Sequence, residues 1–207
     1  SNAINIVASC DNNYAPYIGI VLQSILSNCS QPERIQLYLI DNGISEENIH
    51  LIHQTALPFG ANVKFVKARK DLFEGLPTKR YGVATYQRLA LADILPTHVK
   101  RVIYLDSDII VLHDIHELWR EVQSIEGIAA VENFSARPTN TLAIDRAGYF
   151  NAGILGINLD FWRTHDIKNK LIGFLRSDAH IIHLDQCALN HVFKARWHRL
   201  DLKWNVQ

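Results

Sequence analysis

The chain has 207 residues, of which 48% are hydrophobic and 20% charged, a composition typical of a globular protein that can bury a core without disulfides. Its 21 basic and 21 acidic residues balance, which argues against a dedicated nucleic-acid binder, because such proteins depend on surplus Lys and Arg. No apolar run reaches the length of a membrane span, and no signal peptide is seen.

The first third of the chain predicts alternating strands and helices. Residues 4–9 form a short apolar run that predicts a buried strand, and apolar residues at helical spacing predict a helix ending near Asn28. A second strand is expected over 35–40, and Ser45 is expected to cap the next helix. A third strand follows at 63–66. This alternation predicts an α/β fold with an open, mostly parallel sheet flanked by helices.

The middle of the chain contains the clearest strand, over 101–105, after a helix expected at 86–95. Asp106-Ser107-Asp108 comes directly after that strand. Ligands of open α/β sheets bind at the carboxyl ends of the strands, so this tripeptide is placed where a site is expected.

The last third begins with an aperiodic stretch, 133–147, which we interpret as a surface loop or lid. A strand is expected at 154–159, and helices are expected at 161–176 and 185–193. Ser1-Asn2-Ala3 is typical of the scar of a cleaved expression tag, so residues 4–207 are predicted to form a single domain. The three cysteines lack paired spacing, which favours a reducing cytoplasm over a disulfide framework.

Asp106 and Asp108 are candidate metal ligands. Carboxylate oxygens suit hard divalent cations such as Mg²⁺ and Mn²⁺, which keep further coordination sites for phosphate oxygens. A bare Asp-x-Asp also occurs by chance at turns. The apolar run that follows, 109–112, favours metal binding over a chance turn, because unpaired carboxylates near a core are energetically costly.

Five segments in order along the chain then share one resemblance: Ile6–Tyr14, Ala84–Leu89, Val102–Ile109, Tyr149–Leu159 and His183–Asn190. They resemble the first strand and nucleotide loop, the Tyr-x-Arg helix start, the metal-binding core, the Phe-Asn-Ala-Gly strand and the Asp-Gln helix of family 8 glycosyltransferases. That family includes bacterial lipopolysaccharide galactosyl- and glucosyltransferases and, more distantly, glycogenin. The resemblance implies a GT-A fold with a Rossmann-like nucleotide-sugar domain, a retaining transfer from a UDP-hexose, and a divalent metal, with Mn²⁺ preferred to Mg²⁺.

The resemblance also implies roles for residues at the nucleotide end of a donor site. Asp11 and Asn13 would hydrogen-bond the uracil and ribose, Tyr14 would stack on the uracil, and Ser9 would lie beneath the nucleotide. Asp106 and Asp108 would bind the metal, with Ser107 near the ribose. From the residues alone, Asp11 and Asn13 could equally cap the next helix, and Tyr14 could be an ordinary half-buried aromatic.

At the sugar end, the resemblance implies that Arg88 reaches the sugar or diphosphate, and that Asn151, Ala152 and Asp185 contact the hexose. Gln186 would sit beside the anomeric carbon. Alone, Arg88 would more often be a surface residue, Asn151 part of a turn, and Asp185 a helix cap. A carboxamide is a poor nucleophile, so front-face displacement fits Gln186 better than double displacement.

Two departures from the family pattern stand out. Cys187 occupies the position after the Asp-Gln pair, where the family often has a second acid. The family's later segment, with a His metal ligand and a Gly/Lys diphosphate clamp, has no counterpart in this sequence. His191 and His198 do not lie in the matching context, so we do not expect either to replace that ligand.

The sequence bears differently on three other functions. A dinucleotide-dependent dehydrogenase needs a Gly-x-Gly-x-x-Gly turn after the first strand, where this chain has Cys10-Asp11-Asn12-Asn13. A metal-dependent nucleotide-sugar hydrolase and a non-catalytic nucleotide-sugar-binding module remain alternatives. The expected acceptor is a saccharide or glycolipid such as a lipopolysaccharide core, and the expected location is the cytoplasm, with contact at the inner membrane face left open. The sequence does not decide the hexose or the oligomeric state.

Overall fold

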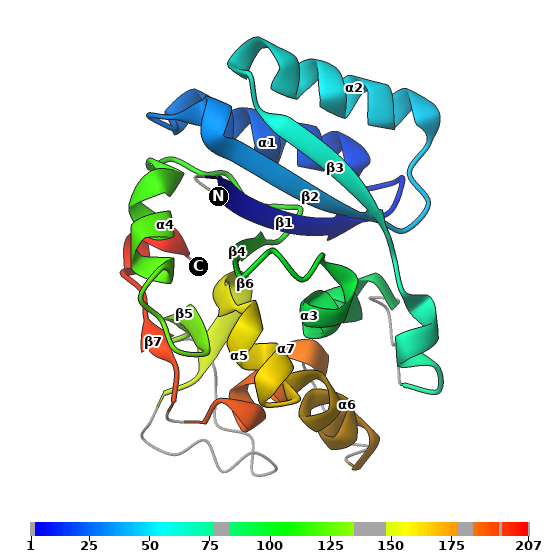
Figure 1. Ribbon diagram of the computed structural model, residues 1–207, viewed down its shortest axis with the longest axis vertical. Helices are drawn as coiled ribbons and strands as arrows, with labels where there is room; N and C mark the ends of the chain where they lie inside the picture. Colours follow the sequence, from blue (N-terminus) through cyan, green and yellow to red (C-terminus); the bar gives the residue numbers. More distant parts are fainter. Residues whose placement is uncertain (1–2, 77–82, 135–147, 178–183, 195, 207) are drawn as a thin grey trace.

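The computed structural model describes residues 3–76, 83–134, 148–177, 184–194 and 196–206 (Figure 1). One seven-stranded sheet runs through it in the order β3-β2-β1-β4-β6-β5-β7. Most of the loop or lid expected at 133–147 lies outside the described residues, as does His183 of the last resembling segment.

The first half of the sheet follows the predicted alternation, and each predicted element is confirmed. The elements are β1 (Ile4–Cys10), α1 (Ala15–Asn28), β2 (Ile35–Asp41), α2 (Glu46–Ala56) and β3 (Asn62–Lys67). The predicted cap is also confirmed, because the Ser45 side chain accepts a hydrogen bond from the Asn48 backbone N–H at 3.3 Å.

The second half contains the elements that complete the sheet and cover it. They are the 3₁₀-helix η5 (Val83–Ala90), α3 (Leu91–Ile94), β4 (Arg101–Leu105), α4 (Ile115–Val122), β5 (Ile128–Glu132), β6 (Phe150–Asn158), α5 (Leu159–Thr164), α6 (Ile167–Ser177), α7 (Leu184–Val192), β7 (His198–Arg199) and the short 3₁₀-helix η6 (Leu202–Trp204).

The sheet is mostly parallel, as predicted, with one reversed strand. β1, β2, β3 and β4 pair in parallel, and so do β5 and β7. β6 is antiparallel to both of its neighbours, β4 and β5. Because β6 runs backwards, its first residues lie beside the carboxyl end of β4.

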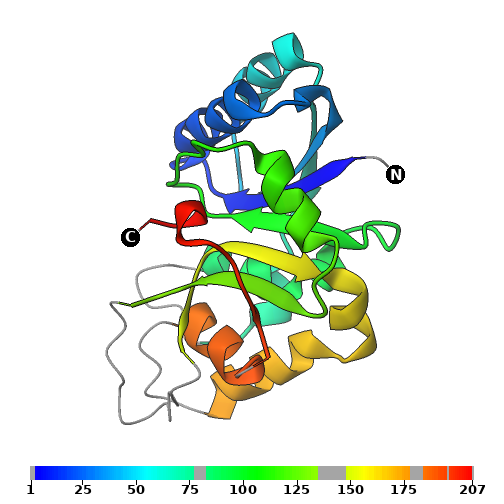
Figure 2. The same cartoon turned by 90° about the vertical axis from the view of Figure 1, so that its left-hand side faces the viewer.

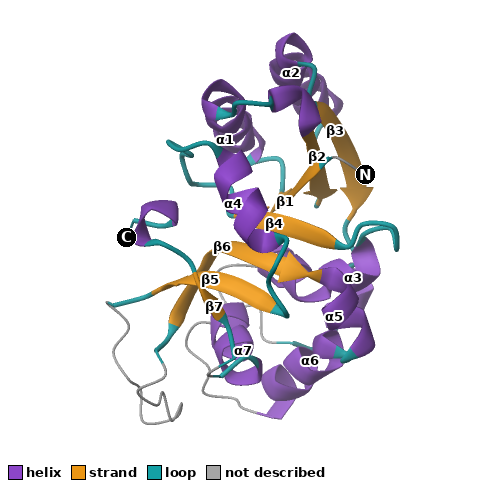
Figure 3. Ribbon diagram, turned by 60° about the vertical axis from the view of Figure 1, so that its left-hand side comes forward, coloured by secondary structure: helices purple, strands orange, loops and turns teal. Residues whose placement is uncertain are grey.

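Each face of the sheet packs against its own set of helices, which Figures 2 and 3 show from the side. One buried cluster joins one sheet face to α1, α2 and α4, and we call it the α1-side core. The other cluster joins the opposite face to η5, α3, α5, α6 and α7, and we call it the α5-side core. Strand residues alternate between them, so that Ile103 and Leu105 belong to the first, and Val102 and Tyr104 to the second.

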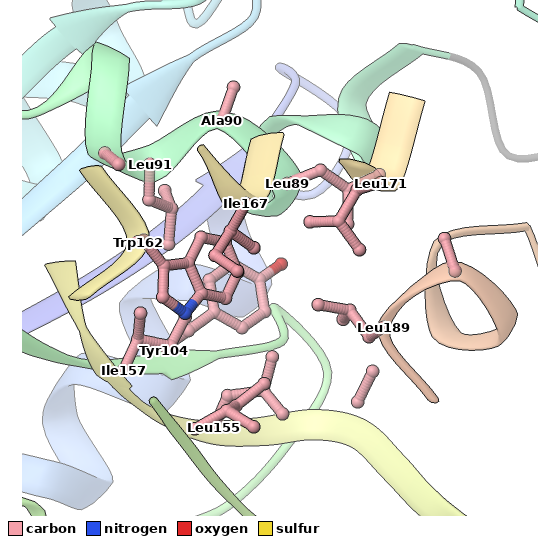
Figure 4. Close-up of a cluster of buried hydrophobic side chains, with 14 of the residues drawn as sticks. Leu89, Ala90, Leu91, Tyr104, Leu155, Ile157, Trp162, Ile167, Leu171 and Leu189 are labelled. Carbon is pink, nitrogen blue, oxygen red and sulfur yellow. The ribbon is translucent and has the colours of Figure 1, made fainter. Parts of the chain in front are cut away.

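The α5-side core brings Tyr104 of β4 against Trp162 of α5, with Leu155 and Ile157 of β6 beside them (Figure 4). Burial of these large apolar side chains holds β4 and β6 against the helices that cover this face of the sheet. Since the sheet is buried on both faces, its strands read as nearly continuous apolar runs.

Two predicted helices differ from the structure. The helix expected at 161–176 is broken at Asp166, which adopts a left-handed backbone with φ of 50°, a conformation that Asp tolerates better than most residues. The helix expected at 86–95 is mostly 3₁₀, and only Leu91–Ile94 is α-helical. The β6 strand also begins earlier than predicted, at Phe150.

In the part of the chain that the structure describes, none of the helices has both the length and the apolar character needed to cross a bilayer.

Candidate active site

A cavity of about 570 Å³ opens at the carboxyl ends of β1 and β4. Every predicted site residue except Asn13 lines it: Ser9, Asp11, Tyr14, Arg88, Asp106, Ser107, Asp108, Asn151, Ala152, Asp185 and Gln186. These residues come from segments separated by up to 177 positions in the sequence, and the fold brings them to one edge of the sheet.

The loop after β1 forms the wall of the cavity next to α1. The Asp11 carboxylate accepts backbone N–H bonds from Asn13 at 2.9 Å and Tyr14 at 3.1 Å, so it shapes the turn into α1 as well as facing the cavity. The Asn12 side chain turns away and binds Ser45 and Asn48 at the start of α2. Tyr14 keeps 49% of its surface exposed, which leaves a ring face available for stacking.

Arg88 lies at the centre of the site, and it is buried rather than exposed. Its Nη2 binds the Asp106 carboxylate at 2.6 Å, its Nε binds the Asp185 carboxylate at 2.9 Å, and its Nη1 donates to the Ala152 carbonyl at 2.7 Å. Burial by itself lowers the pKa of Arg88, but the charge of Asp106 and its other neighbours raises the pKa above its ordinary value. The guanidinium therefore stays charged and joins the two carboxylates.

The 3₁₀ conformation of η5 explains how Arg88 and Thr85 act on the same partner. A 3₁₀-helix has three residues per turn, so residues i and i+3 lie on one face. The Thr85 hydroxyl donates to one oxygen of Asp185 at 3.2 Å, while Arg88 binds the other. An α-helix over the same residues would offset these two side chains.

Asp106 is the most constrained of the acidic residues. One of its oxygens accepts from Arg88 and from the Tyr104 hydroxyl, the latter at 3.1 Å. Burial raises its pKa, and the nearby charges of Asp185 and Asp108 raise it further, while Arg88 opposes them. Its carboxylate is thus held in a region of surplus negative charge.

The residues present fit a divalent cation. Asp106 and Asp185 flank the Arg88 guanidinium, and Asp108, which is exposed, lines the same cavity. A side chain at Gly153 would place its Cβ 3.3 Å from Oδ2 of Asp106, so the bare glycine keeps the space beside that oxygen open. Among the described residues, no group of three or more His, Cys, Asp or Glu is placed to hold a metal, and Asp106 and Asp108 are the residues that would hold the cation.

The two histidines set aside from the sequence lie elsewhere. His191 stacks on Phe174 with the ring centres 4.1 Å apart, and His198 lies 4.0 Å from Glu121. Neither lines the cavity.

Gln186 is fixed at both ends of its carboxamide. Its Oε1 accepts the Ala152 backbone N–H at 2.9 Å, and its Nε2 donates to the Tyr149 hydroxyl at 3.2 Å. That hydroxyl lies 3.4 Å from the sulfur of Cys187, which is buried. Burial raises the pKa of Tyr149 well above its ordinary range, so the phenol stays neutral.

Ala152 can bind both Gln186 and Arg88 because β6 is irregular at this point. In the pairing of β5 with β6, Ala130 faces Leu155 and Val131 faces Asn151, so residues 152–154 have no partner in β5. The backbone N–H and C=O of Ala152 are instead bound by side chains of the site. Irregularities of this kind often lie next to active sites, where they redirect the strand.

Several residues of this site were not predicted. Thr85, Tyr104 and Tyr149 lay inside the resembling segments without an assigned role, although Tyr104 could be placed by strand alternation once Asp106 was known. Asn205, whose Nδ2 donates to the side-chain oxygen Oδ1 of Asn151 at 2.9 Å, gave no signal in the sequence.

The comparisons with known proteins agree with this geometry. The family described as glycosyl transferase family 8 matches residues 5–207. The chain belongs to this family. It is a glycosyltransferase, with the α/β GT-A fold of its structural neighbours.

Similar proteins include general stress protein A of Bacillus subtilis, at 33% identity over 99% of this chain and 74% of that protein. The lipopolysaccharide 1,3-galactosyltransferase of Salmonella typhimurium is 28% identical over 100% of this chain and 64% of its own length. A crystal structure of the galactosyltransferase LgtC with donor and acceptor sugar analogues has a TM-score of 0.84 at 27% identity, covering 96% of this chain and 74% of LgtC. This family 8 glycosyltransferase spans between 48% and 74% of the first five curated relatives it matches.

Proposed function

We propose that the chain transfers galactose or glucose from a UDP-sugar to a saccharide acceptor, with retention of anomeric configuration and with help from a divalent metal. The ion pairs of the buried Arg88 with Asp106 and Asp185, in a cavity that Asp108 also lines, are the observation that supports this most strongly. This arrangement combines surplus negative charge for a cation with an open cavity for the donor. The lipopolysaccharide galactosyltransferase and LgtC, two relatives named above, favour a hexose donor and a glycan acceptor.

In this proposal the two ends of the cavity bind different parts of the donor. Tyr14 stacks on the uracil, while Asp11, Ser9 and Ser107, which line the cavity beside it, surround the uracil and ribose. Stacking on an exposed aromatic ring is a common way of binding a base. Asp106 and Asp108 hold the cation, preferably Mn²⁺, which when bound neutralises charge on the departing diphosphate.

The sugar end is formed by Asn151, Ala152, Asp185 and Gln186. Asp185 is engaged by Arg88 and Thr85, so its carboxylate is oriented and partly neutralised, which makes it a weak nucleophile. The Gln186 carboxamide is held by Ala152 and Tyr149 and is itself a poor nucleophile. Both features favour front-face displacement, in which the acceptor hydroxyl attacks on the leaving-group side while Gln186 orients the hexose. Unchanged turnover of Gln186→Ala at saturating substrates would contradict this role.

The proposed donor site can be tested by calorimetric titration of UDP, UDP-galactose and UDP-glucose with Mn²⁺, with Mg²⁺ and with chelator. Asp108→Asn is the sharper metal variant, because Asp108 is exposed and lies outside the Arg88 ion pairs. Asp71→Asn is a matched control, since Asp71 is exposed and pairs with Arg69. We expect metal-dependent binding that Asp108→Asn weakens at least tenfold and the control leaves unchanged.

Binding that persists in chelator, or that Asp108→Asn leaves intact, would refute the metal role. Release of UDP only when a saccharide acceptor is added would support transfer. Equal release without acceptor would favour the hydrolase, and tight binding without release under either condition would favour the non-catalytic binding module. An oligosaccharide core with and without its lipid anchor would show whether the acceptor is a glycolipid and whether membrane contact matters.

A further inference from the structure

The C-terminal turn brings a polar side chain, that of Asn205, against Asn151, which lines the cavity. Trp204, which is only 5% exposed, anchors η6 in the α1-side core, and the Asp201 side chain accepts the Lys203 backbone N–H at 2.9 Å (Figure 2, red). The next residue, Asn205, has its own backbone N–H bound to the Leu202 carbonyl at 3.1 Å. The position of the Asn205 side chain is therefore set by a folded and anchored turn.

The hydrogen bonds around Asn151 decide which way its carboxamide points. Its Oδ1 accepts from the Gly153 backbone N–H at 2.7 Å and from Nδ2 of Asn205 at 2.9 Å. A backbone N–H can only donate, so the Asn151 atom that faces it must be the oxygen. Because Asn151 lines the cavity, its Nδ2 is left as the end that can donate to a ligand.

Gly153 keeps these groups close together. A Cβ at this position would lie 2.9 Å from Oδ1 of Asn151, 3.3 Å from Oδ2 of Asp106 and 3.6 Å from Nδ2 of Asn205. The polar atoms of three segments thus converge over one bare backbone position. A larger residue would displace at least one of them.

We propose that Asn205 is a positioning residue for the donor sugar. It holds the Asn151 carboxamide with its oxygen turned inward, so that Nδ2 donates to an oxygen of the hexose. This inference rests on the proposed function, which places the hexose against Asn151. It assigns no direct contact between Asn205 and the nucleotide.

The proposal is tested by a double-mutant cycle of Asn151→Ala and Asn205→Ala, with affinities for UDP-hexose and for UDP measured by calorimetry in Mn²⁺. Loss of one hydrogen bond to a positioned group is expected to weaken UDP-hexose binding about five- to tenfold in Asn205→Ala. Affinity for UDP should stay within twofold of wild type. In the Asn151→Ala background, adding Asn205→Ala should change UDP-hexose binding by less than about twofold, because coupled residues do not act additively.

Asn205→Asp separates the hydrogen bond from packing. Aspartate fills nearly the same space but cannot donate to Oδ1 of Asn151, so it should weaken UDP-hexose binding at least as much as alanine. Asn169→Ala is the matched control, because Asn169 is exposed on α6 and binds only Asp166 among the contacts described. Thermal melts of all variants check that they are folded.

Equal weakening of UDP and UDP-hexose, or a full additional effect of Asn205→Ala on the Asn151→Ala background, would overturn the positioning role. Wild-type UDP-hexose binding with no change in Asn205→Ala would overturn it while leaving the proposed function intact. Failure of the wild-type protein to bind any UDP-hexose while it binds UDP would overturn both.

Discussion

Replacing Arg88 by Met should destabilise the protein strongly, because it leaves two carboxylates without their shared partner. The side chain of Arg88 is 9% exposed, and those of Asp106 and Asp185 are 31% and 13% exposed. Methionine keeps much of the apolar volume over the Tyr104 ring, which Arg88 now covers at 4.5 Å, so the change tests charge more than packing.

The expected loss follows from the partial burial of this network. Breaking a buried ion pair by removing one partner costs about 3–5 kcal/mol, and the exposure of Asp106 puts the expected value near the lower end. A chain of this size typically has about 5–15 kcal/mol of stability. At roughly 2–4 °C for each kcal/mol, the melting temperature should fall by about 6–12 °C.

Urea unfolding followed by far-UV circular dichroism, in EDTA, gives the free energy directly. Arg176→Met is the matched control, since Arg176 is exposed on α6, and it should change stability by no more than about 0.5 kcal/mol. Adding Asp106→Asn and Asp185→Asn to Arg88→Met should restore at least half of the loss, because no buried charge then lacks a partner.

The defect should also depend on pH. Without Arg88, the pKa of Asp106, already raised by burial and by Asp185 and Asp108, rises further in the folded protein. A carboxyl whose folded pKa is raised costs stability above its unfolded pKa, so the defect should be larger at pH 8 than at pH 5. A loss below about 1 kcal/mol, or no recovery in the triple variant, would refute the proposed charge balance.

Three further predictions concern glycine packing, stacking and the thiols. Gly153→Ala should weaken UDP-hexose binding with little loss of stability. Gly156→Ala, whose Cβ would lie 2.6 Å from Cγ2 of Val122, should instead lower the free energy of unfolding in urea by about 1–3 kcal/mol and leave the affinity of the folded protein unchanged. The opposite pattern would contradict the assignment of Gly153 to the site. Tyr14→Ala should weaken UDP binding by about 1–3 kcal/mol in calorimetry, while the variant loses less than about 0.5 kcal/mol of stability. Tyr17→Ala is the control, and an equal loss of UDP affinity in that variant would argue against stacking on Tyr14. Burial, together with the charges of Asp11 and Asp41, raises the pKa of Cys10 from 9.0 to about 12. The folded thiol should therefore resist a disulfide reagent at pH 8 and react once the protein is unfolded, and its contribution to stability should be lost as the pH rises from 9 towards 12. Rapid labelling of Cys10 in the native protein would contradict this.

Much of the fold could be predicted because its strands are buried on both faces. β1, β2 and β4 are apolar runs that end at polar clusters, and this pattern indicates both the strand and the edge where ligands bind. The apolar pattern predicted the start of β6 at residue 154, four residues late, because Asn151-Ala152-Gly153 by itself is typical of a turn. Its pairing with β5 and β4 depends on partners distant in sequence.

The sequence predicted which residues form the candidate site better than it predicted which of them contact one another. The family resemblance placed Asp106, Arg88 and Asp185 in one site, and all three line the cavity, but the contacts of Arg88 with the two carboxylates were not predicted. These contacts depend on the 3₁₀ geometry of η5, which the apolar pattern of 86–95 did not distinguish from an α-helix. The Asn205 contact arises from the packing of Trp204, which no local pattern reports.

The reversal of β6 explains how the site combines a strand end with a strand start. Asp106 follows the last residue of β4, and its backbone N–H binds the Gly153 carbonyl at 2.9 Å, so the two chains stay paired past the end of β4. A parallel strand in this place would bring its last residues to the cavity and carry Asn151 to the opposite edge. The irregularity opposite Val131 then frees the Ala152 backbone for Gln186 and Arg88. Substituting the side chain of Ala152 would leave its backbone N–H and C=O in place. The hydrogen bonds of these two groups can therefore be removed only by changing their partners, so the Arg88 and Gln186 variants are the direct tests of this part of the site.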